Sequence, residues 1–226
     1  MAILFDLDGT LLDTSRDMYT AASKVFAEEK LPTIDYATFR SNISFGSKKI
    51  LNAVLYSSVK TEVERAAYID YLMPRFLAHY SDTKFQNTLA FVGIEELLCS
   101  LEASGIAWGI VTNKVQALTE PLLKQIGYLE RSACVVCGDT TSKSKPHPEP
   151  LLYACNLINV NPSDCIYIGD AITDVQAGKA AGMRTIAAGF GFIPNDVSPA
   201  TWQADALVNS PAEILPWIKQ WLPSTL

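Results

Sequence analysis

The feature that most constrains the fold of this chain is a repeated succession of a short apolar run, a polar cluster and a helical pattern. Uninterrupted apolar runs of this length are typical of strands that are buried on both faces of a sheet. Their alternation with helices predicts an α/β fold, in which an open, parallel, Rossmann-like sheet carries helices on both faces. The runs lie at Ala2–Phe5, Ile106–Val111, Cys134–Cys137, Cys165–Ile168, Thr185–Ala188 and, more weakly, Ala206–Val208.

One long stretch, from Thr14 to about Thr83, interrupts this alternation with helical periodicity and no convincing strand. It lies between the first and second expected strands, where a crossover needs only about a dozen residues. We therefore predict a helical cap subdomain at 14–83, inserted into an α/β catalytic core formed by 1–13 and 84–226. Pro74 is expected to end or restart a helix inside the cap.

Charge, hydropathy and cysteine content exclude several classes of protein. The 226 residues include 18 Lys and Arg and 24 Asp and Glu, which gives a net charge of −6. This negative charge disfavours nucleic acid or an anionic membrane as a partner. No apolar run approaches the roughly 18 residues of a membrane helix, and no basic flank marks a secretory signal. The five cysteines, an odd number, fit reduced thiols, with Cys134 and Cys137 buried in the core. We expect a cytoplasmic protein.

Acidic residues follow two of the expected strands at the point where each strand ends. Asp6 and Asp8 come after the first strand, and Asp170 and Asp174 come after the fourth. The ligand crevice of an open α/β sheet lies outside the carboxyl ends of its strands, so these four carboxylates should converge. Two like charges about 4 Å apart cost about 4 kcal/mol at an effective dielectric of 20, so the cluster needs a cation, shared protons or both. An all-oxygen site that meets a phosphate favours Mg²⁺ over Ca²⁺ or Zn²⁺.

Hydrogen-bond donors are expected at the same edge of the sheet. Thr112 and Asn113 follow the second strand, and Lys145 lies in a polar, proline-rich loop. A hydroxyl, an amide, an ammonium group and Mg²⁺ together form a cradle for phosphate oxygens. Thr112 is also a candidate helix N-cap, and Asp139 is interpreted as a capping or turn residue.

Four segments of the chain resemble the ordered motifs of the haloacid dehalogenase superfamily. They occur in the order of that family and span the core from Met1 to about Gly191, and the helical insert resembles the cap of the phosphoglycolate-phosphatase-like branch. The segments are Phe5-Asp6-Leu7-Asp8-Gly9-Thr10-Leu11, Ile110-Val111-Thr112-Asn113-Lys114, Lys145-Pro146-His147-Pro148, and Gly169-Asp170 with Asp174.

The resemblance implies roles for the acidic residues. Asp6 would be the nucleophile that forms an aspartyl-phosphate, and Asp8 would be the general acid and then the general base. Magnesium would be held by the Asp6 side chain, the backbone carbonyl of Asp8 and Asp170. Asp174 would be a further ligand or would support the ligands from outside.

The resemblance also implies groups that bind the phosphate and select the substrate. In the cap, the loop Ser44-Phe45-Gly46-Ser47-Lys48-Lys49 is the candidate to cover the site. There Gly46 would allow close approach, and Lys48 or Arg16 would meet a carboxylate of the substrate. The expected phosphate-binding residues are Gly9, Thr10, Thr112, Asn113 and Lys145.

The implied activity is Mg²⁺-dependent hydrolysis of a small phosphomonoester, with 2-phosphoglycolate as the first candidate. A sugar-phosphate mutase of the β-phosphoglucomutase type shares Asp6 and Asp8 and remains an alternative. A non-catalytic binding or regulatory protein on the same scaffold remains another, because a fold does not determine a function. A dehalogenase is disfavoured, because those relatives lack the acid at the position of Asp8.

Overall fold

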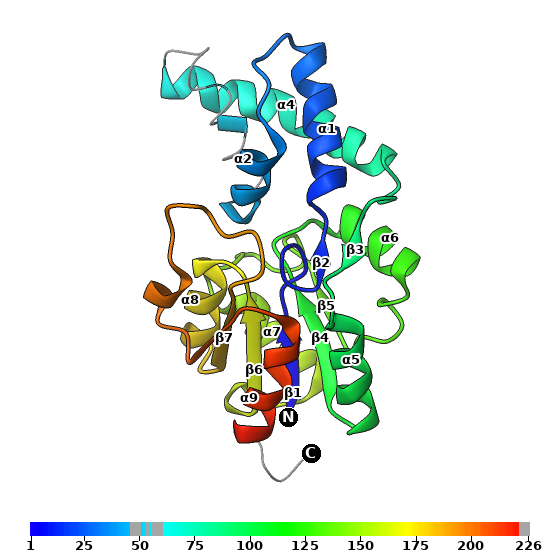
Figure 1. Cartoon of the computed structure of the whole chain (residues 1–226), viewed down its shortest axis with the longest axis vertical. Helices are drawn as coiled ribbons and strands as arrows, with labels where there is room; N and C mark the ends of the chain where they lie inside the picture. The colour runs from blue at the N-terminus through cyan, green and yellow to red at the C-terminus, as the bar shows by residue number, and fades with distance from the viewer. Residues whose placement is uncertain (46–50, 53–54, 56–60, 222–226) are drawn as a thin grey trace. The chain divides into compact units, whose positions relative to one another are not determined.

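The computed structural model describes residues 1–45, 51–52, 55 and 61–221, which form two compact units (Figure 1). One unit consists of Met1–Asp13 together with the chain from Ala90 onward, and the other unit is Thr14–Leu89. The second boundary therefore lies beyond the expected 83/84. Residues after position 83 belong with the helices, because Asn87 and Thr88 donate hydrogen bonds to the buried carboxylate of Asp17.

In the described part of the first unit, six parallel strands form one sheet in the order β5-β4-β1-β6-β7-β8. The predicted apolar runs agree with these strands to within one residue at each end. The strands are β1 (Ala2–Phe5), β4 (Ala107–Val111), β5 (Val135–Val136), β6 (Cys165–Gly169), β7 (Arg184–Ala188) and β8 (Ala206–Val208). A separate pairing of β2 (Leu12–Asp13) with β3 (Leu89–Ala90) was not predicted, because both residues of β3 are exposed and no buried apolar run marks this strand.

Helices of the first unit cover the sheet and bury its apolar side chains. Helix α7 packs against β4 and β5, and α8 packs against β6 and β7 (Figure 1). The cysteines of the chain all lie in described ranges and are free thiols; Cys134 and Cys137 are buried, as predicted. Among the helices that the described residues form, none has the length and apolar character needed to cross a bilayer. The helices are α5 (Ile94–Ala103), α6 (Gln116–Ile126), α7 (Glu149–Ile158), α8 (Ile172–Ala180) and α9 (Ile214–Trp221), with short 3-10 helices at Pro162–Asp164, Pro199–Trp202 and Pro211–Glu213.

The register of the three central strands sets the position of the polar residues that follow them. Phe5 in β1 lies opposite Ile110 in β4 and Ile168 in β6. The chain therefore leaves all three strands at the same edge of the sheet, within two residues of this pairing. The acidic and hydroxyl side chains just beyond are brought together by strand pairing, although they are far apart in sequence.

The second unit is helical, as its periodicity predicts. Helix α1 packs along α4, and Phe26 on α1 and Phe76 on α4 are both buried. Pro74 lies inside α4, so the expectation that it ends or restarts a helix is wrong. The packing of Leu72 and Phe76 and the capping box at Thr61 hold the helix despite the missing N–H. The helices are α1 (Ser15–Glu28), α2 (Tyr36–Ser41) and α4 (Glu62–Asp82), with a 3-10 helix at Ile43–Phe45.

Candidate active site

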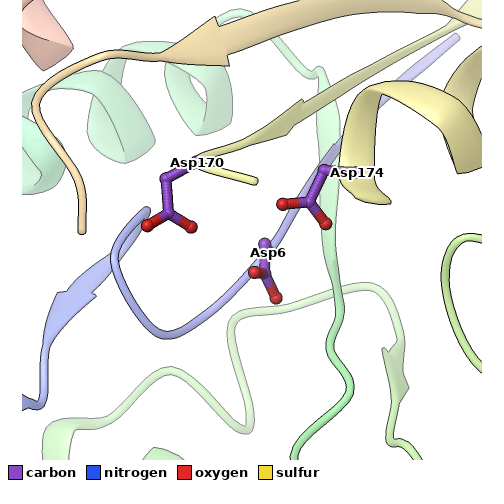
Figure 2. Close-up of side chains that lie close together, drawn as sticks. All are labelled: Asp6, Asp170 and Asp174. Carbon is purple, nitrogen blue, oxygen red and sulfur yellow. The ribbon is translucent and has the colours of Figure 1, made fainter. Parts of the chain in front are cut away.

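Three of the four predicted carboxylates converge at the edge of the sheet. Asp6 follows β1, Asp170 follows β6, and Asp174 lies in the first turn of α8. One carboxylate oxygen from each lies within 4.8 Å of the others, and Figure 2 shows the three side chains pointing toward a common region. The fourth residue, Asp8, directs its carboxylate to the ammonium group of Lys114.

The buried ammonium group of Lys145 joins the ends of three strands. Its Nζ lies 2.9 Å from Oδ1 of Asp6 and 2.7 Å from Oδ1 of Asp174. It also donates to the hydroxyl of Tyr167 at 2.7 Å and to the carbonyl oxygen of Val111 at 3.1 Å. With only 2% of its side chain exposed, Lys145 is a fixed positive charge beside Asp6 rather than the solvated lysine that a loop position would suggest.

Burial shifts the acidity of this pair. Burial raises the pKa of Asp6 from 3.8 to about 6; the Lys145 ammonium opposes this shift and the negative charge of Asp174 adds to it. Burial also disfavours the charged form of Lys145, but the charges of Asp174 and Asp6 outweigh it and raise the pKa of Lys145 to about 12. Lys145 therefore stays protonated at neutral pH, while Asp6 titrates close to neutrality when no cation is bound.

Asp174 is held in place by hydrogen bonds to both of its carboxylate oxygens. Its Oδ1 accepts hydrogen bonds from Lys145 and Tyr167, and its Oδ2 accepts one from the N–H of Ala171 at 3.0 Å. This last bond caps the first turn of α8, where negative charge is also favoured by the helix dipole. Its carboxylate also belongs to the acidic cluster, so its predicted role as a further ligand or as a support for the ligands remains a prediction.

Asp170 is held by groups that leave it close to Asp6. Its Oδ2 accepts a hydrogen bond from the N–H of Phe192 at 2.8 Å, and the hydroxyl of Thr10 lies 3.5 Å from its Oδ1. Gly9 has φ +87°, and a Cβ at this position would lie 2.1 Å from Oδ2 of Asp170. Gly9 is therefore required both by the backbone and by the close approach of Asp170. The prediction had given it a role only toward phosphate.

Thr112 and Asn113 both lie at the end of β4, and Thr112 does not cap the helix that follows. The Thr112 hydroxyl accepts a hydrogen bond from the N–H of Lys114, while α6 begins only after Val115, so Thr112 is not the helix N-cap. The N–H of Gln116 in the first turn of α6 donates to Oδ1 of Asp139 at 2.8 Å, which agrees with the capping or turn role predicted for Asp139.

The Asn113 side chain fixes the loop that carries the buried lysine. Its Oδ1 accepts from the backbone N–H of Lys145 at 3.0 Å, and its Nδ2 donates to the carbonyl oxygen of Lys145 at 3.1 Å. This reciprocal pair uses one of the two N–H donors of the amide and gives Asn113 a positioning role, while its predicted contact with phosphate remains a prediction. The predicted phosphate ligands Thr112 and Lys145 remain at the edge of the sheet.

Two residues at the site had been given no role from the sequence. Lys114 places its Nζ 2.9 Å from Oδ1 and 3.1 Å from Oδ2 of Asp8. The Tyr167 hydroxyl accepts from Lys145, and its single O–H is shared between the Val111 carbonyl at 2.8 Å and Oδ1 of Asp174 at 3.2 Å. Lys114 could have been noticed because it directly follows Thr112 and Asn113, whereas Tyr167 carries no signal within an apolar strand.

Of the three candidate specificity residues, Arg16 lies in the described part of the helical unit. Arg16 is exposed on α1, and its guanidinium carbon lies 5.4 Å from the centre of the Tyr36 ring. Gly46 and Lys48 lie outside the described residues. Their predicted roles toward a substrate therefore remain predictions.

The donor set fits a hard divalent cation. Carboxylate oxygens from Asp6 and Asp170 lie together, and neither a thiol nor an imidazole belongs to the cluster found among the described residues. The four carboxylates and the two lysines at the site leave a formal charge of −2, which one divalent cation would neutralise. Oxygen ligands with this charge are typical of Mg²⁺ or Mn²⁺ sites.

Comparisons with known proteins identify relatives that are named as phosphatases. A model of the haloacid dehalogenase-like hydrolase family matches residues 3–188. The chain is 38% identical to the N-acetylmuramic acid 6-phosphate phosphatase of Pseudomonas aeruginosa, over 95% of this chain and 92% of that protein. It is 40% identical to a phosphoglycolate phosphatase of Xanthomonas campestris, over 94% of each. A solved structure of a predicted phosphoglycolate phosphatase from Haemophilus somnus shares the fold, with a TM-score of 0.84, 24% identity and 96% of each chain covered.

Proposed function

Since this chain belongs to the haloacid dehalogenase-like hydrolase family and is a phosphoric monoester hydrolase, we propose that it acts through a covalent aspartyl-phosphate on Asp6. The observation that carries the proposal is the placement of Asp6, one residue beyond the central strand and 2.9 Å from the ammonium group of Lys145. A carboxylate held beside a fixed positive charge can approach the phosphorus of an anionic ester without the repulsion that the net charge of the chain would otherwise cause.

In the proposed reaction, a carboxylate oxygen of Asp6 bonds to phosphorus as the bond from phosphorus to the ester oxygen breaks. Asp8 gives its proton to that departing oxygen, which leaves as an alcohol. Asp8, now a carboxylate, takes a proton from water, and the resulting hydroxide attacks the aspartyl-phosphate. Inorganic phosphate departs and Asp6 is regenerated. Lys145, Thr112 and the backbone near Gly9 and Thr10 would bind the phosphoryl oxygens.

Magnesium is the proposed cofactor, held by Asp6, Asp170 and the backbone carbonyl of Asp8. When bound, it would neutralise charge on the phosphoryl group and keep Asp6 ionised. The remaining contributions come from the chain itself. Lys145 orients Asp6, Asp174 and Tyr167 hold Lys145, and Phe192 and Thr10 hold Asp170.

We expect phosphate release to depend on the divalent cation. Dialysis against EDTA should lower the turnover of p-nitrophenyl phosphate at least about 10³-fold, and added Mg²⁺ should restore it, because metal and charge stabilisation supply most of the acceleration. Calorimetric titration of Mg²⁺ into the wild type and into Asp170→Asn gives a second readout, with weaker binding expected in the variant. Metal-independent turnover would refute the cofactor assignment, and absence of turnover at any Mg²⁺ concentration would favour a binding protein.

For the substrate, we propose an alkyl phosphate that also bears a carboxylate. 2-Phosphoglycolate remains the first candidate, and N-acetylmuramic acid 6-phosphate is the second because a relative of similar identity carries that name. Both compounds combine a phosphomonoester with a carboxylate. Arg16 or Lys48 would meet the carboxylate, and Gly46 would allow the loop to approach.

A comparison of each acid with a partner that lacks the carboxylate tests this substrate class. The pairs are 2-phosphoglycolate with ethyl phosphate, and N-acetylmuramic acid 6-phosphate with N-acetylglucosamine 6-phosphate. In the pair that contains the natural substrate, we expect kcat/KM to be about 10- to 100-fold higher for the compound with the carboxylate than for its partner. The reason is that a hydrogen bond to a charged group contributes about 1.5–3 kcal/mol. Lys48→Ala or Arg16→Ala should narrow that ratio. Equal values within both pairs would refute the substrate class, and phosphate transfer to a sugar phosphate without free phosphate would indicate a mutase.

A further inference from the structure

The ion pair between Lys114 and Asp8 has no role in the function as described so far. The Lys114 Nζ contacts both oxygens of the Asp8 carboxylate, at 2.9 and 3.1 Å, and only 6% of the Lys114 side chain and 18% of the Asp8 side chain are exposed. We propose that Lys114 is a positioning residue that holds the carboxyl group of Asp8 in place for proton transfer to the leaving group. The proposal rests on the proposed function, because it assumes that Asp8 is the general acid.

The backbone around Lys114 is built to hold that side chain in one direction. The N–H of Lys114 donates to the hydroxyl of Thr112 at 3.2 Å, and its carbonyl oxygen accepts from the N–H of Gly138 at 2.9 Å. A Cβ on Gly138 would lie 2.2 Å from the carbonyl oxygen of Asn113, so only glycine lets the segment after β5 come this close. The backbone of Lys114 is thus fixed by hydrogen bonds at both its N–H and its carbonyl oxygen.

Because the backbone of Lys114 is fixed, its side chain loses less conformational entropy when its ammonium group is held on Asp8. A free lysine side chain loses rotamer entropy when its ammonium group is held in one place, which is one reason why exposed ion pairs contribute little to stability. The stem of Lys114 is buried against the site, and its charge lies at a carboxylate from the loop after β1. The contact therefore joins two loops that each carry groups of the proposed reaction.

Each of the two proposed reacting carboxylates is in contact with its own lysine ammonium group. Lys145 contacts Asp6, and Lys114 contacts Asp8. A lysine donor can remain bonded to one carboxyl oxygen while the other oxygen carries or releases a proton. Lys114 can therefore keep Asp8 in the same place before and after it gives its proton to the ester oxygen, which general acid catalysis requires.

The dependence of kcat/KM on the leaving group distinguishes a role of Lys114 in proton transfer from a purely structural role. In p-nitrophenyl phosphate the leaving group departs without a proton, whereas an alkyl phosphate needs the proton from Asp8. We expect Lys114→Met to lower kcat/KM about 10²-fold for the best alkyl phosphate and less than about threefold for p-nitrophenyl phosphate. Lys114→Arg should recover part of the loss for the alkyl phosphate, because it restores a cation.

The control is Lys124→Met, which removes an exposed lysine from α6 and should leave both values of kcat/KM unchanged. A double-mutant cycle with Asp8→Asn provides the second measurement. If Lys114 acts through Asp8, adding Lys114→Met to Asp8→Asn should change kcat/KM less than about twofold. Thermal unfolding of each variant shows whether the protein remains folded.

The outcomes separate this inference from the proposed function. If the wild type releases phosphate but Lys114→Met lowers kcat/KM equally for both substrates, Lys114 binds substrate or supports the fold, and the inference is wrong. The inference also fails if Lys114→Met leaves the alkyl phosphatase activity unchanged, or if it causes a full 10²-fold loss in the Asp8→Asn background. If the wild type releases no phosphate from either substrate, the proposed function itself is wrong.

Discussion

Asp6→Asn should abolish turnover and at the same time stabilise the metal-free protein. An amide cannot serve as the nucleophile that forms the aspartyl-phosphate, so kcat should fall by about 10⁴-fold or more. The side chain keeps its size, and the buried neighbours Phe5 and Leu7 are untouched. The fold should therefore be retained.

The stabilising effect follows from the raised pKa of Asp6. In the metal-free folded protein this pKa is about 6, against 3.8 ordinarily, so keeping Asp6 ionised at pH 7 costs about 3 kcal/mol at 1.36 kcal/mol per unit. Asparagine removes this cost, and the free energy of unfolding in EDTA at pH 7 should rise by about 1–3 kcal/mol. The gain should shrink as the pH falls from 6 toward 4, because wild-type Asp6 then becomes neutral.

Urea unfolding of both proteins in EDTA, at several pH values, measures this difference. Asp196→Asn, at an exposed carboxylate of the same unit, is the matched control and should change neither turnover nor stability appreciably. Near-normal turnover of Asp6→Asn would overturn the nucleophile assignment. Lower stability than the wild type at pH 7 would show that the ion pair with Lys145 outweighs the burial of the charge.

Lys145→Met should cause the largest loss of stability at this site. It removes the ammonium group that lies between Asp6 and Asp174 and leaves two neighbouring carboxylates, one half-buried and one buried, without it. Removing one partner of a buried ion pair typically costs about 3–5 kcal/mol. Phosphatase activity should be lost as well, because Lys145 is also the proposed phosphate ligand.

The pH dependence identifies the cause of that loss. The pKa of Asp6 is already raised to about 6, and removal of Lys145 would raise it further. Protonation below pH 6 relieves the repulsion between the carboxylates, so the difference from the wild type should become smaller as the pH falls. Lys143→Met changes an exposed lysine of the same loop and serves as control. A loss of stability that is constant from pH 5 to pH 8 would point to packing instead of charge.

The sheet could be predicted because its strands are buried on both faces. Burial forces each strand to be an uninterrupted apolar run, and the parallel arrangement places the residues after every strand at one edge. This is why the positions of Asp6, Thr112 and Asp170 follow from local sequence alone. Pro74 was misjudged because the penalty for proline in a helix is local, whereas the packing of Leu72 and Phe76 that outweighs it is not.

The detailed partners of the site could not be predicted, because each depends on contacts between distant segments. Lys114 meets Asp8 across 106 positions of sequence, and the Asn113 amide bonds to the backbone of Lys145 across 32. No periodicity encodes such pairs. A polar residue at the end of a strand can bind a ligand or hold a neighbouring loop, and only its surroundings distinguish the two uses.

Local sequence was enough to specify the parallel sheet, the helical insert and the acidic edge, because apolar runs, helical periodicity and the alternation of strands with helices are visible within short stretches of chain. Folding in three dimensions settled how charge is distributed within that edge. It placed Lys145 between Asp6 and Asp174, assigned Lys114 to Asp8, and engaged both oxygens of Asp174. The physical reason is that pairing and burial of charges depend on the distance between atoms in space, and strand pairing brings together groups that the chain itself keeps far apart.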